Sequence, residues 1–186
     1  MDIIENYATE IPKELSLVYL AKPIYGGWVT FTVHLAKKYH YRVYKVGKRT
    51  EKKVRSYGYG IDYQNVCLDD LLKLPNLFIT AIDKHYWDIL PHLPPSTQIV
   101  IHDPTELKSS KSNPNPLIQE SKLLHQFKVY TIRETVQRYL LDNFQIQSTF
   151  KVHPFYEYEC NKEPYECHAV TISRIDFDKN TDLILR

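Results

Sequence analysis

The chain has 186 residues, of which 43% are apolar and 25% charged, with a formal net charge of +2. This length and apolar content suffice to bury the core of one domain with some chain left over. A nearly neutral charge gives no argument for nucleic acid or a membrane surface as the partner. No apolar run approaches the roughly 18 residues of a membrane helix, and the acidic N-terminus is unlike a signal peptide. The sequence therefore predicts a soluble, cytoplasmic protein.

Three cysteines, an odd number, are consistent with reduced thiols in the cytoplasm: Cys67, Cys160 and Cys167. Two of them lie near His168 and His153, which are potential zinc ligands. Their spacing matches no compact zinc pattern. We therefore expect no metal site.

The first predicted elements are a strand, a glycine loop, a helix and a second strand over residues 15–47. The apolar run 15–21 suits a strand buried on both faces, and Gly26 and Gly27 follow it. Apolar residues then recur at helical spacing, and residues 41–46 alternate as a second strand. The whole unit has the size of one βαβ crossover in a parallel sheet.

Gly26 and Gly27 lie where a strand passes into a helix. A helix N-terminus presents unpaired amide groups there, and residues without side chains let a ligand approach the backbone. The pair lacks the third glycine of the dinucleotide fingerprint and the Gly-Lys-Ser/Thr of a P-loop. From spacing alone, a tight turn and a ligand-binding loop are both open interpretations.

A basic segment follows over residues 48–60, where lysines and arginines precede Tyr57 and Tyr59. Basic residues beside stackable aromatic rings can contact the phosphates and bases of an extended polymer. The other interpretation is a solvated surface loop with no binding role, and the composition favours it.

Predicted strands and helices alternate through the rest of residues 15–155. The strands are 63–68, 76–82, 98–103, 127–132 and 148–152, and the helices are 68–74, 84–92, 117–126 and 133–144. Asp83 is expected to cap the helix at 84–92. Residues 104–116, rich in proline, serine and asparagine, are predicted to form a long polar loop. The alternation predicts an α/β fold, a Rossmann-like and mostly parallel sheet with helices on both faces.

Ligands of such sheets bind at the carboxyl ends of the strands. Gly26 and Gly27, Asp83, and the pair His102 and Asp103 all follow predicted strands at that end. One crevice will gather these residues if their strands are close neighbours.

The last part of the chain begins a new pattern. Residues 156–167 are polar and acidic without periodicity, which is typical of a linker, and 168–173 form a new apolar strand. The predicted organisation is an N-terminal extension at 1–14, a Rossmann-like domain at 15–155, a linker at 156–167 and the start of a truncated second domain at 168–186.

Two stretches of the chain resemble the GT-B glycosyltransferases, specifically the large retaining family that includes glycogen synthase-like and lipopolysaccharide-building enzymes. The first stretch is Pro23, then Gly26 and Gly27, then Leu35 and Ala36 before a polar break and a valine-rich strand. It looks like the opening of these enzymes. The resemblance implies that the glycines lie at the substrate cleft.

The second stretch is the apolar strand that ends in Arg174, followed by Asp176 and Lys179. It looks like the first strand, loop and helix of the C-terminal half of the family. In these enzymes the arginine and lysine hold the diphosphate of the donor, and a glycine commonly follows the lysine, where this chain has Asn180. Fixed cations stabilise the charge of a leaving nucleoside diphosphate. Two ordinary surface charges at a helix start are the other interpretation.

The same resemblance gives a role to His102 and Asp103. Many of these enzymes place a histidine after a mid-domain strand, close to the acceptor and the reacting sugar. Asp103 is the alternative, as a base for the acceptor hydroxyl. A hydrogen-bonded histidine at a strand end is the structural alternative for His102.

Taken as a whole, the resemblance implies the acceptor-side half of a glycosyltransferase that uses a nucleotide-diphosphate sugar without a metal or other cofactor. The acceptor, whether glycan, lipid or DNA, is not assigned. A pair of glutamates that contacts the donor in this family would lie beyond Arg186, so we expect an incomplete enzyme that is inactive alone.

Two further hypotheses stay open. One is a viral-type DNA glucosyltransferase whose basic residues at 48–60 and 108–111 track DNA, and the other is a non-catalytic Rossmann-like binding module.

Overall fold

The computed structural model describes residues 14–22, 26–46, 55–56, 62–107 and 119–156. All of them belong to the first of two compact units, Met1–Tyr156, whereas the second unit, Glu157–Arg186, lies outside the described residues. Several predicted features therefore lie outside them as well: most of the basic segment 48–60, the lysines of 108–111, the linker, and the second domain with Arg174 and Lys179.

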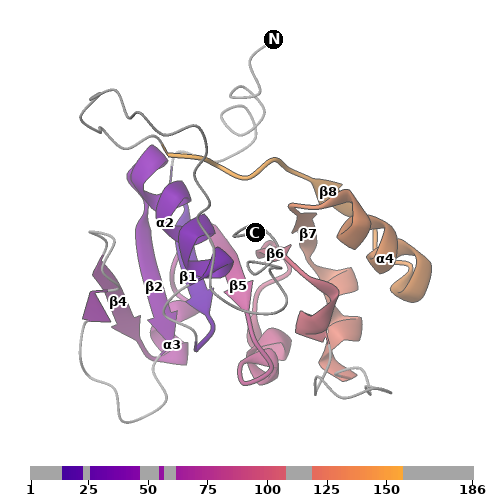
Figure 1. Ribbon diagram of the computed structural model, residues 1–186. Helices are drawn as coiled ribbons and strands as arrows, with labels where there is room; N and C mark the ends of the chain where they lie inside the picture. Colours follow the sequence, from indigo (N-terminus) through magenta and orange to yellow (C-terminus); the bar gives the residue numbers. More distant parts are fainter. Residues whose placement is uncertain (1–13, 23–25, 47–54, 57–61, 108–118, 157–186) are drawn as a thin grey trace, which may run out of the picture. The chain divides into compact units, whose positions relative to one another are not determined.

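An eight-stranded sheet forms the centre of the first unit (Figure 1). Its strands are β1 (Ser16–Leu20), β2 (Arg42–Val46), β3 (Arg55–Ser56), β4 (Asp62–Val66), β5 (Leu77–Ile82), β6 (Gln98–Ile101), β7 (Lys128–Thr131) and β8 (Ser148–Phe150). Their spatial order is β3-β4-β2-β1-β5-β6-β7-β8, and only β3, which pairs with β4, runs antiparallel to its neighbour. The predicted Rossmann-like α/β fold with a mostly parallel sheet is confirmed.

The strand order explains where this sheet can form a site. From β1 the chain moves outward to β2 and β4, and then crosses back to β5 on the other side of β1. The order therefore reverses between β1 and β5. In doubly wound sheets of this kind, such a reversal leaves a crevice outside the carboxyl ends of the two strands.

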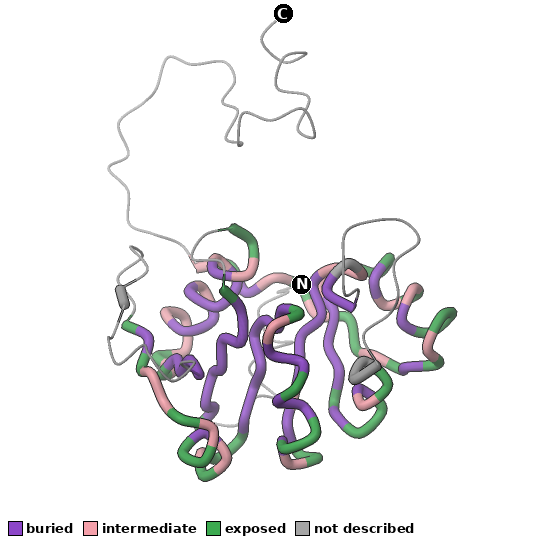
Figure 2. The backbone as a smooth tube through the Cα atoms, turned by 90° about the horizontal axis from the view of Figure 1, so that it is seen from below, coloured by how far each residue is buried: buried purple, intermediate pink, exposed green. Residues whose placement is uncertain are grey.

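The connecting helices cover both faces of the sheet. They are α2 (Gly27–Tyr39), α3 (Leu68–Leu71), α4 (Glu134–Phe144) and the 3-10 helices η1 (Trp87–His92), η2 (Pro104–Leu107) and η3 (Gln119–Gln126). Because side chains alternate along a strand, the sheet supplies two separate cores. One core packs Leu17 and Tyr19 against α2, and the other packs Val18 against η1, η3 and α4. Figure 2 shows the strands as the buried centre of the unit.

Helix α2 is the element that the site depends on most. Its apolar residues, among them Val29, Phe31 and Leu35, are buried against the sheet. The hydroxyl groups of Thr32 and of Thr80 on β5 are hydrogen-bonded at 2.8 Å, so the helix and the sheet are also joined by a buried polar contact. The helix ends at His40, whose φ of 58° is left-handed, as is common at helix C-termini.

The helix predicted at 84–92 is present but begins later, at residue 87. Residues Trp87–His92 form a 3-10 helix that contains Pro91. Proline lacks the amide hydrogen and has a fixed φ, so it does not continue an α-helical ladder. Asp83 does not cap this helix with its side chain, and it bonds instead to the backbone N–H groups of Lys22 and His85.

The helical stretch predicted at 117–126 is a 3-10 helix, η3, over residues 119–126, and residues 117–118 lie outside the described residues. One further prediction needs correction. The predicted polar loop 104–116 begins with the 3-10 helix η2, in which Glu106 and Leu107 are buried. The prediction is wrong for residues 104–107 because it was based on composition without the packing of these two side chains, and residues 108–116 lie outside the described residues. Within the described residues, no helix has the length and apolar character needed to cross a membrane.

Candidate functional site

The predicted site residues that the structure describes lie at the carboxyl edge of the sheet, whereas Arg174 and Lys179 lie outside the described residues. Gly26 and Gly27 follow β1, Asp83 follows β5, and His102 and Asp103 follow β6. Because β1, β5 and β6 are consecutive neighbours in the sheet, these segments lie next to one another at the point where the strand order reverses.

Gly26 and Gly27 form the start of α2 and leave its backbone accessible. Gly26 has a φ of 96°, a conformation that residues with side chains rarely adopt. A Cβ added at either glycine would meet no atom of the described residues within 4 Å. Backbone strain therefore explains a glycine at position 26 but not at position 27. Both glycines are exposed at the start of a 13-residue helix, whose dipole favours negative charge there.

Asp83 joins the ends of β1 and β5. Its Oδ2 accepts a hydrogen bond from the backbone N–H of Lys22 at 2.7 Å, and its Oδ1 accepts one from His85 at 2.8 Å. Its own backbone N–H donates to the carbonyl of Leu20 at 2.9 Å. Since both carboxylate oxygens already accept backbone bonds, the contribution of Asp83 is to fix the shape of this edge.

His102 points into the protein and not toward solvent. Only 5% of the residue is exposed, its Nε2 donates to the carbonyl oxygen of Thr80 at 2.7 Å, and its ring meets the ring of Phe31 edge-on at 4.9 Å. Burial lowers the pKa of His102 to about 4, so the ring is uncharged near neutral pH. Of the two interpretations that the sequence allowed for His102, this geometry matches the structural one, a hydrogen-bonded histidine at a strand end.

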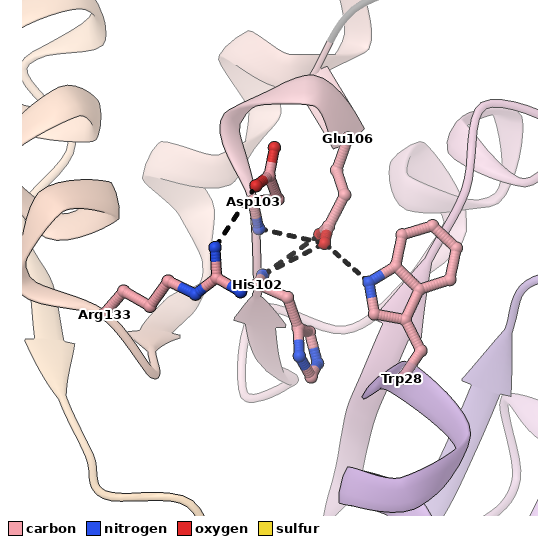
Figure 3. Close-up of polar contacts among 5 residues, drawn as sticks. All are labelled: Trp28, His102, Asp103, Glu106 and Arg133. Carbon is pink, nitrogen blue, oxygen red and sulfur yellow. Dashed lines mark hydrogen bonds and ion pairs between the residues drawn. The ribbon is translucent and has the colours of Figure 1, made fainter. Parts of the chain in front are cut away.

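Asp103 is the more accessible of the two predicted catalytic residues. Its side chain is 41% exposed, and its Oδ2 lies 3.5 Å from a guanidinium nitrogen of Arg133, which precedes α4 (Figure 3). An ion pair of this length at a partly exposed site is weak. A partly exposed carboxylate is a group that can accept a proton in solution chemistry.

Glu106 is the central residue that the sequence reasoning missed. Its Oε1 accepts hydrogen bonds from the indole N–H of Trp28 at 2.8 Å and from the backbone N–H groups of Asp103 at 3.0 Å and His102 at 3.2 Å. Figure 3 shows the carboxyl group enclosed by these donors. Only 4% of the residue is exposed, and burial raises the pKa of Glu106 to about 8.

A local sequence signal for Glu106 does exist. The stretch Asp103-Pro104-Thr105-Glu106 has the spacing of a capping box, in which an acid three residues along reaches back to the N–H of the first residue. The bond from the Asp103 N–H to Glu106 is that contact. The partnership with Trp28, 78 residues away, has no signal in the local pattern.

A second group of rings lies beside α2, where residues 151–156 return past the helix. The ring of His153 lies 5.4 Å from the rings of both Phe31 and His34, and the backbone N–H of Tyr156 donates to His34 Nδ1 at 3.3 Å. Burial lowers the pKa of His153 to about 4. In the described part of the chain, no three histidine, cysteine or acidic side chains are arranged to hold a metal ion.

A groove of about 460 Å³ lies elsewhere, between α4 and β8. Its lining includes Arg138, Leu141 and Phe150 but none of the predicted site residues. The chemistry at the sheet edge and this groove are therefore separate features, and the convergence of polar groups favours the edge as the candidate site.

Comparison of the chain with protein-family models, with curated proteins and with solved structures found no match. The class that the structure defines is an α/β domain with a Rossmann-like parallel sheet.

Proposed function

We propose that this chain is the acceptor-side, Rossmann-like half of a GT-B glycosyltransferase. In this proposal the enzyme transfers a sugar from a nucleotide-diphosphate sugar to a hydroxyl group of a glycan, lipid or DNA acceptor in the cytoplasm, without a metal or other cofactor. Arg174 and Lys179 would hold the diphosphate, and the donor-binding half of the cleft would come from chain outside the described residues.

The observation that carries the proposal is the open backbone at Gly26 and Gly27. It lies at the N-terminus of α2, next to the reversal of strand order between β1 and β5, where doubly wound sheets bind ligands. Gly27 supports this reading best, because neither a positive φ nor a close neighbour requires a glycine there. A glycine without a structural reason fits a position that a substrate approaches.

Within the site, the described contacts favour Asp103 over His102 as the base. Asp103 is partly exposed at the edge, whereas the Nε2 proton of His102 is bound to the Thr80 carbonyl inside the protein. In the proposed reaction, Asp103 accepts the proton of the acceptor hydroxyl as that oxygen forms a bond to the anomeric carbon of the sugar, while the bond from this carbon to the diphosphate breaks and the nucleoside diphosphate leaves. His102 holds the end of β6 in place.

A non-catalytic Rossmann-like binding module is the second candidate. The burial of His102 favours it, because a buried, uncharged ring does not serve a reacting sugar. The two candidates differ in the expected effect of Asp103→Asn. This change abolishes transfer by the proposed enzyme but leaves the affinity of a binding module for its ligand nearly unchanged.

The test uses the longest product of the gene, incubated with a panel of nucleotide-diphosphate sugars and with glycan, lipid and DNA acceptors. Release of nucleoside diphosphate and transfer of labelled sugar are measured. Gly27→Trp places a large side chain at the start of α2 and is expected to lower transfer on the order of 100-fold, because misplaced substrates react far more slowly. Residues 1–186 alone are expected to show no turnover.

The matched control is Lys73→Trp, which places the same side chain at an exposed position four residues before β5, at the opposite edge of the sheet. It is expected to leave transfer unchanged. Equal transfer by the Gly27→Trp protein and the unaltered protein overturns the assigned cleft. No transfer from any donor, combined with ligand binding that survives Asp103→Asn, favours the binding module.

A further inference from the structure

The groove between α4 and β8 is a surface that the candidate site does not use. Helix α4 and strand β8 lie together at one end of the sheet (Figure 1). Four residues of the helix line the groove at the spacing of one helix face: Glu134, Gln137, Arg138 and Leu141. Val136 and Leu140, on the other face, are buried in the core. The helix therefore presents a second face to the groove.

Two large apolar side chains are exposed in this groove. Leu141 of α4 is 48% exposed and Phe150 of β8 is 37% exposed. Only two other large apolar side chains of the described residues are exposed, Val152 and Phe155, and both follow β8. Single exposed apolar side chains are ordinary, whereas apolar side chains that are exposed together indicate a contact surface.

Two opposite charges line the same groove. Glu134 and Arg138 lie one turn apart on α4, and both are exposed. Within the described ranges neither of them forms an ion pair. A ligand with charge of one sign would be attracted by one of them and repelled by the other. A surface that carries the same two charges in the reverse order would pair with both.

An added strand does not fit the groove, although β8 is the last strand of the sheet. The side-chain amide of Gln137 donates to the carbonyl oxygen of Ser148 on β8 at 2.7 Å. A peptide that extends a sheet pairs with free backbone groups along its edge. Because α4 already occupies this carbonyl group, the occupant of the groove is expected to bind through side chains.

We propose that the face of α4 from Glu134 to Leu141, together with Phe150, binds the same face of a second copy of this chain about a two-fold axis. In such an interface every contact between two different residues occurs twice. An axis beside the turn between Glu134 and Arg138 brings each of these long side chains within reach of the opposite charge on the second copy. Leu141 and Phe150 of both copies are then removed from water.

This interface is independent of the proposed reaction, because none of the candidate site residues lines the groove. The groove has a volume of about 460 Å³, and the ion pairs are at the surface. Small interfaces with exposed ion pairs are weak. We therefore expect a reversible dimer with a dissociation constant of roughly 1 to 100 µM.

The test is analytical ultracentrifugation of the full chain up to a concentration on the order of 500 µM, well above that range. Glu134→Arg and Arg138→Glu are each expected to raise the dissociation constant at least about tenfold, because each places like charges opposite one another twice. The double variant Glu134→Arg, Arg138→Glu restores both pairs in the reverse order. Its dissociation constant is expected to return to within about threefold of that of the unaltered protein.

Two further variants serve as controls. Asp69→Arg reverses an exposed charge on α3, which packs beside β2 in the other half of the sheet, and is expected to leave the dissociation constant unchanged. Leu141→Asp places a charge in the apolar part of the groove and is expected to abolish the dimer. Circular dichroism and the urea midpoint verify that each variant is folded.

Three results would each overturn the proposal. The first is a chain that stays monomeric at the highest concentration. The second is a dimer that Glu134→Arg does not weaken, because another surface then holds the two copies together. The third is a double variant that dimerises no better than either single variant, because Glu134 and Arg138 then do not face each other across the axis.

Discussion

The burial of Glu106 predicts that the contribution of this residue to the free energy of unfolding falls as the pH rises. In the folded state the pKa of this carboxyl group is raised from its ordinary 4.5 to about 8, and the cause is burial. Between these two values the folded state holds a proton that the unfolded chain has released. The contribution of Glu106 to the free energy of unfolding is therefore complete below about pH 4.5 and is lost as the pH rises toward 8.

The size of the effect follows from the difference between the two pKa values. Each pKa unit corresponds to about 1.4 kcal/mol, so the whole loss amounts to as much as about 5 kcal/mol. That is a large part of the total stability of a small domain, which is about 5 to 15 kcal/mol. About three quarters of the loss falls between pH 5 and pH 8, a range that an equilibrium unfolding experiment covers.

The assay is urea unfolding, followed by far-ultraviolet circular dichroism, of the unaltered protein and of Glu106→Gln at several pH values. The amide cannot ionise, and its oxygen can keep the three contacts of Oε1. His102 and His153, whose pKa values are lowered by burial, lose their contribution as the pH falls below 6.5 toward 4, and they do so in both proteins. The difference between the two proteins thus isolates Glu106.

The unaltered protein is expected to lose stability relative to Glu106→Gln as the pH rises from 5 to 8, and the difference is expected to level off above pH 8. A difference that stays constant with pH would refute the reasoning, because Glu106 would then have the same pKa in both states. A difference that changes in the opposite direction means that the folded protein stabilises the carboxylate.

Two pairs of substitutions test the other contacts by urea unfolding. Gly26→Ala is expected to lower the free energy of unfolding by about 1 kcal/mol, because its φ of 96° strains a residue with a side chain. Gly27→Ala, which meets no close atom, is expected to be neutral or slightly stabilising, so equal losses at both sites contradict this backbone argument. Trp28→Phe removes a hydrogen bond to Glu106 and is expected to cost about 1 kcal/mol. Tyr39→Phe removes a buried hydroxyl group that has no partner among the described residues and is expected to cost nothing, so a greater loss there than at Trp28 refutes this ranking.

The candidate site was only partly readable from the sequence. Gly26, Gly27, Asp83 and Asp103 could be placed at the carboxyl edge because each follows an apolar run that reads as a buried strand. The orientation of His102 could not be read, because it depends on the Thr80 carbonyl of the neighbouring strand and on Phe31 of α2. The local sequence around a histidine at a strand end is the same whether its side chain faces a substrate or the core.

Glu106 shows why composition alone did not predict the structure of the segment after β6. The segment that follows β6 is rich in proline, serine and asparagine, which is typical of a mobile loop. Its first turn is nevertheless held by a glutamate that is buried between two tryptophans. Charged residues are almost never fully buried, so a sequence argument assigns such a residue to the surface unless its partners are known.

What the sequence determined by itself is the alternation of strands and helices and, with it, the parallel α/β fold. Both follow from local periodicity, because strands buried on both faces must be apolar and crossover helices must be amphipathic. The tertiary structure alone decided the strand order that brings β1, β5 and β6 together, the inward orientation of His102 and the burial of Glu106. These depend on contacts between residues tens of positions apart, which leave no period in the chain.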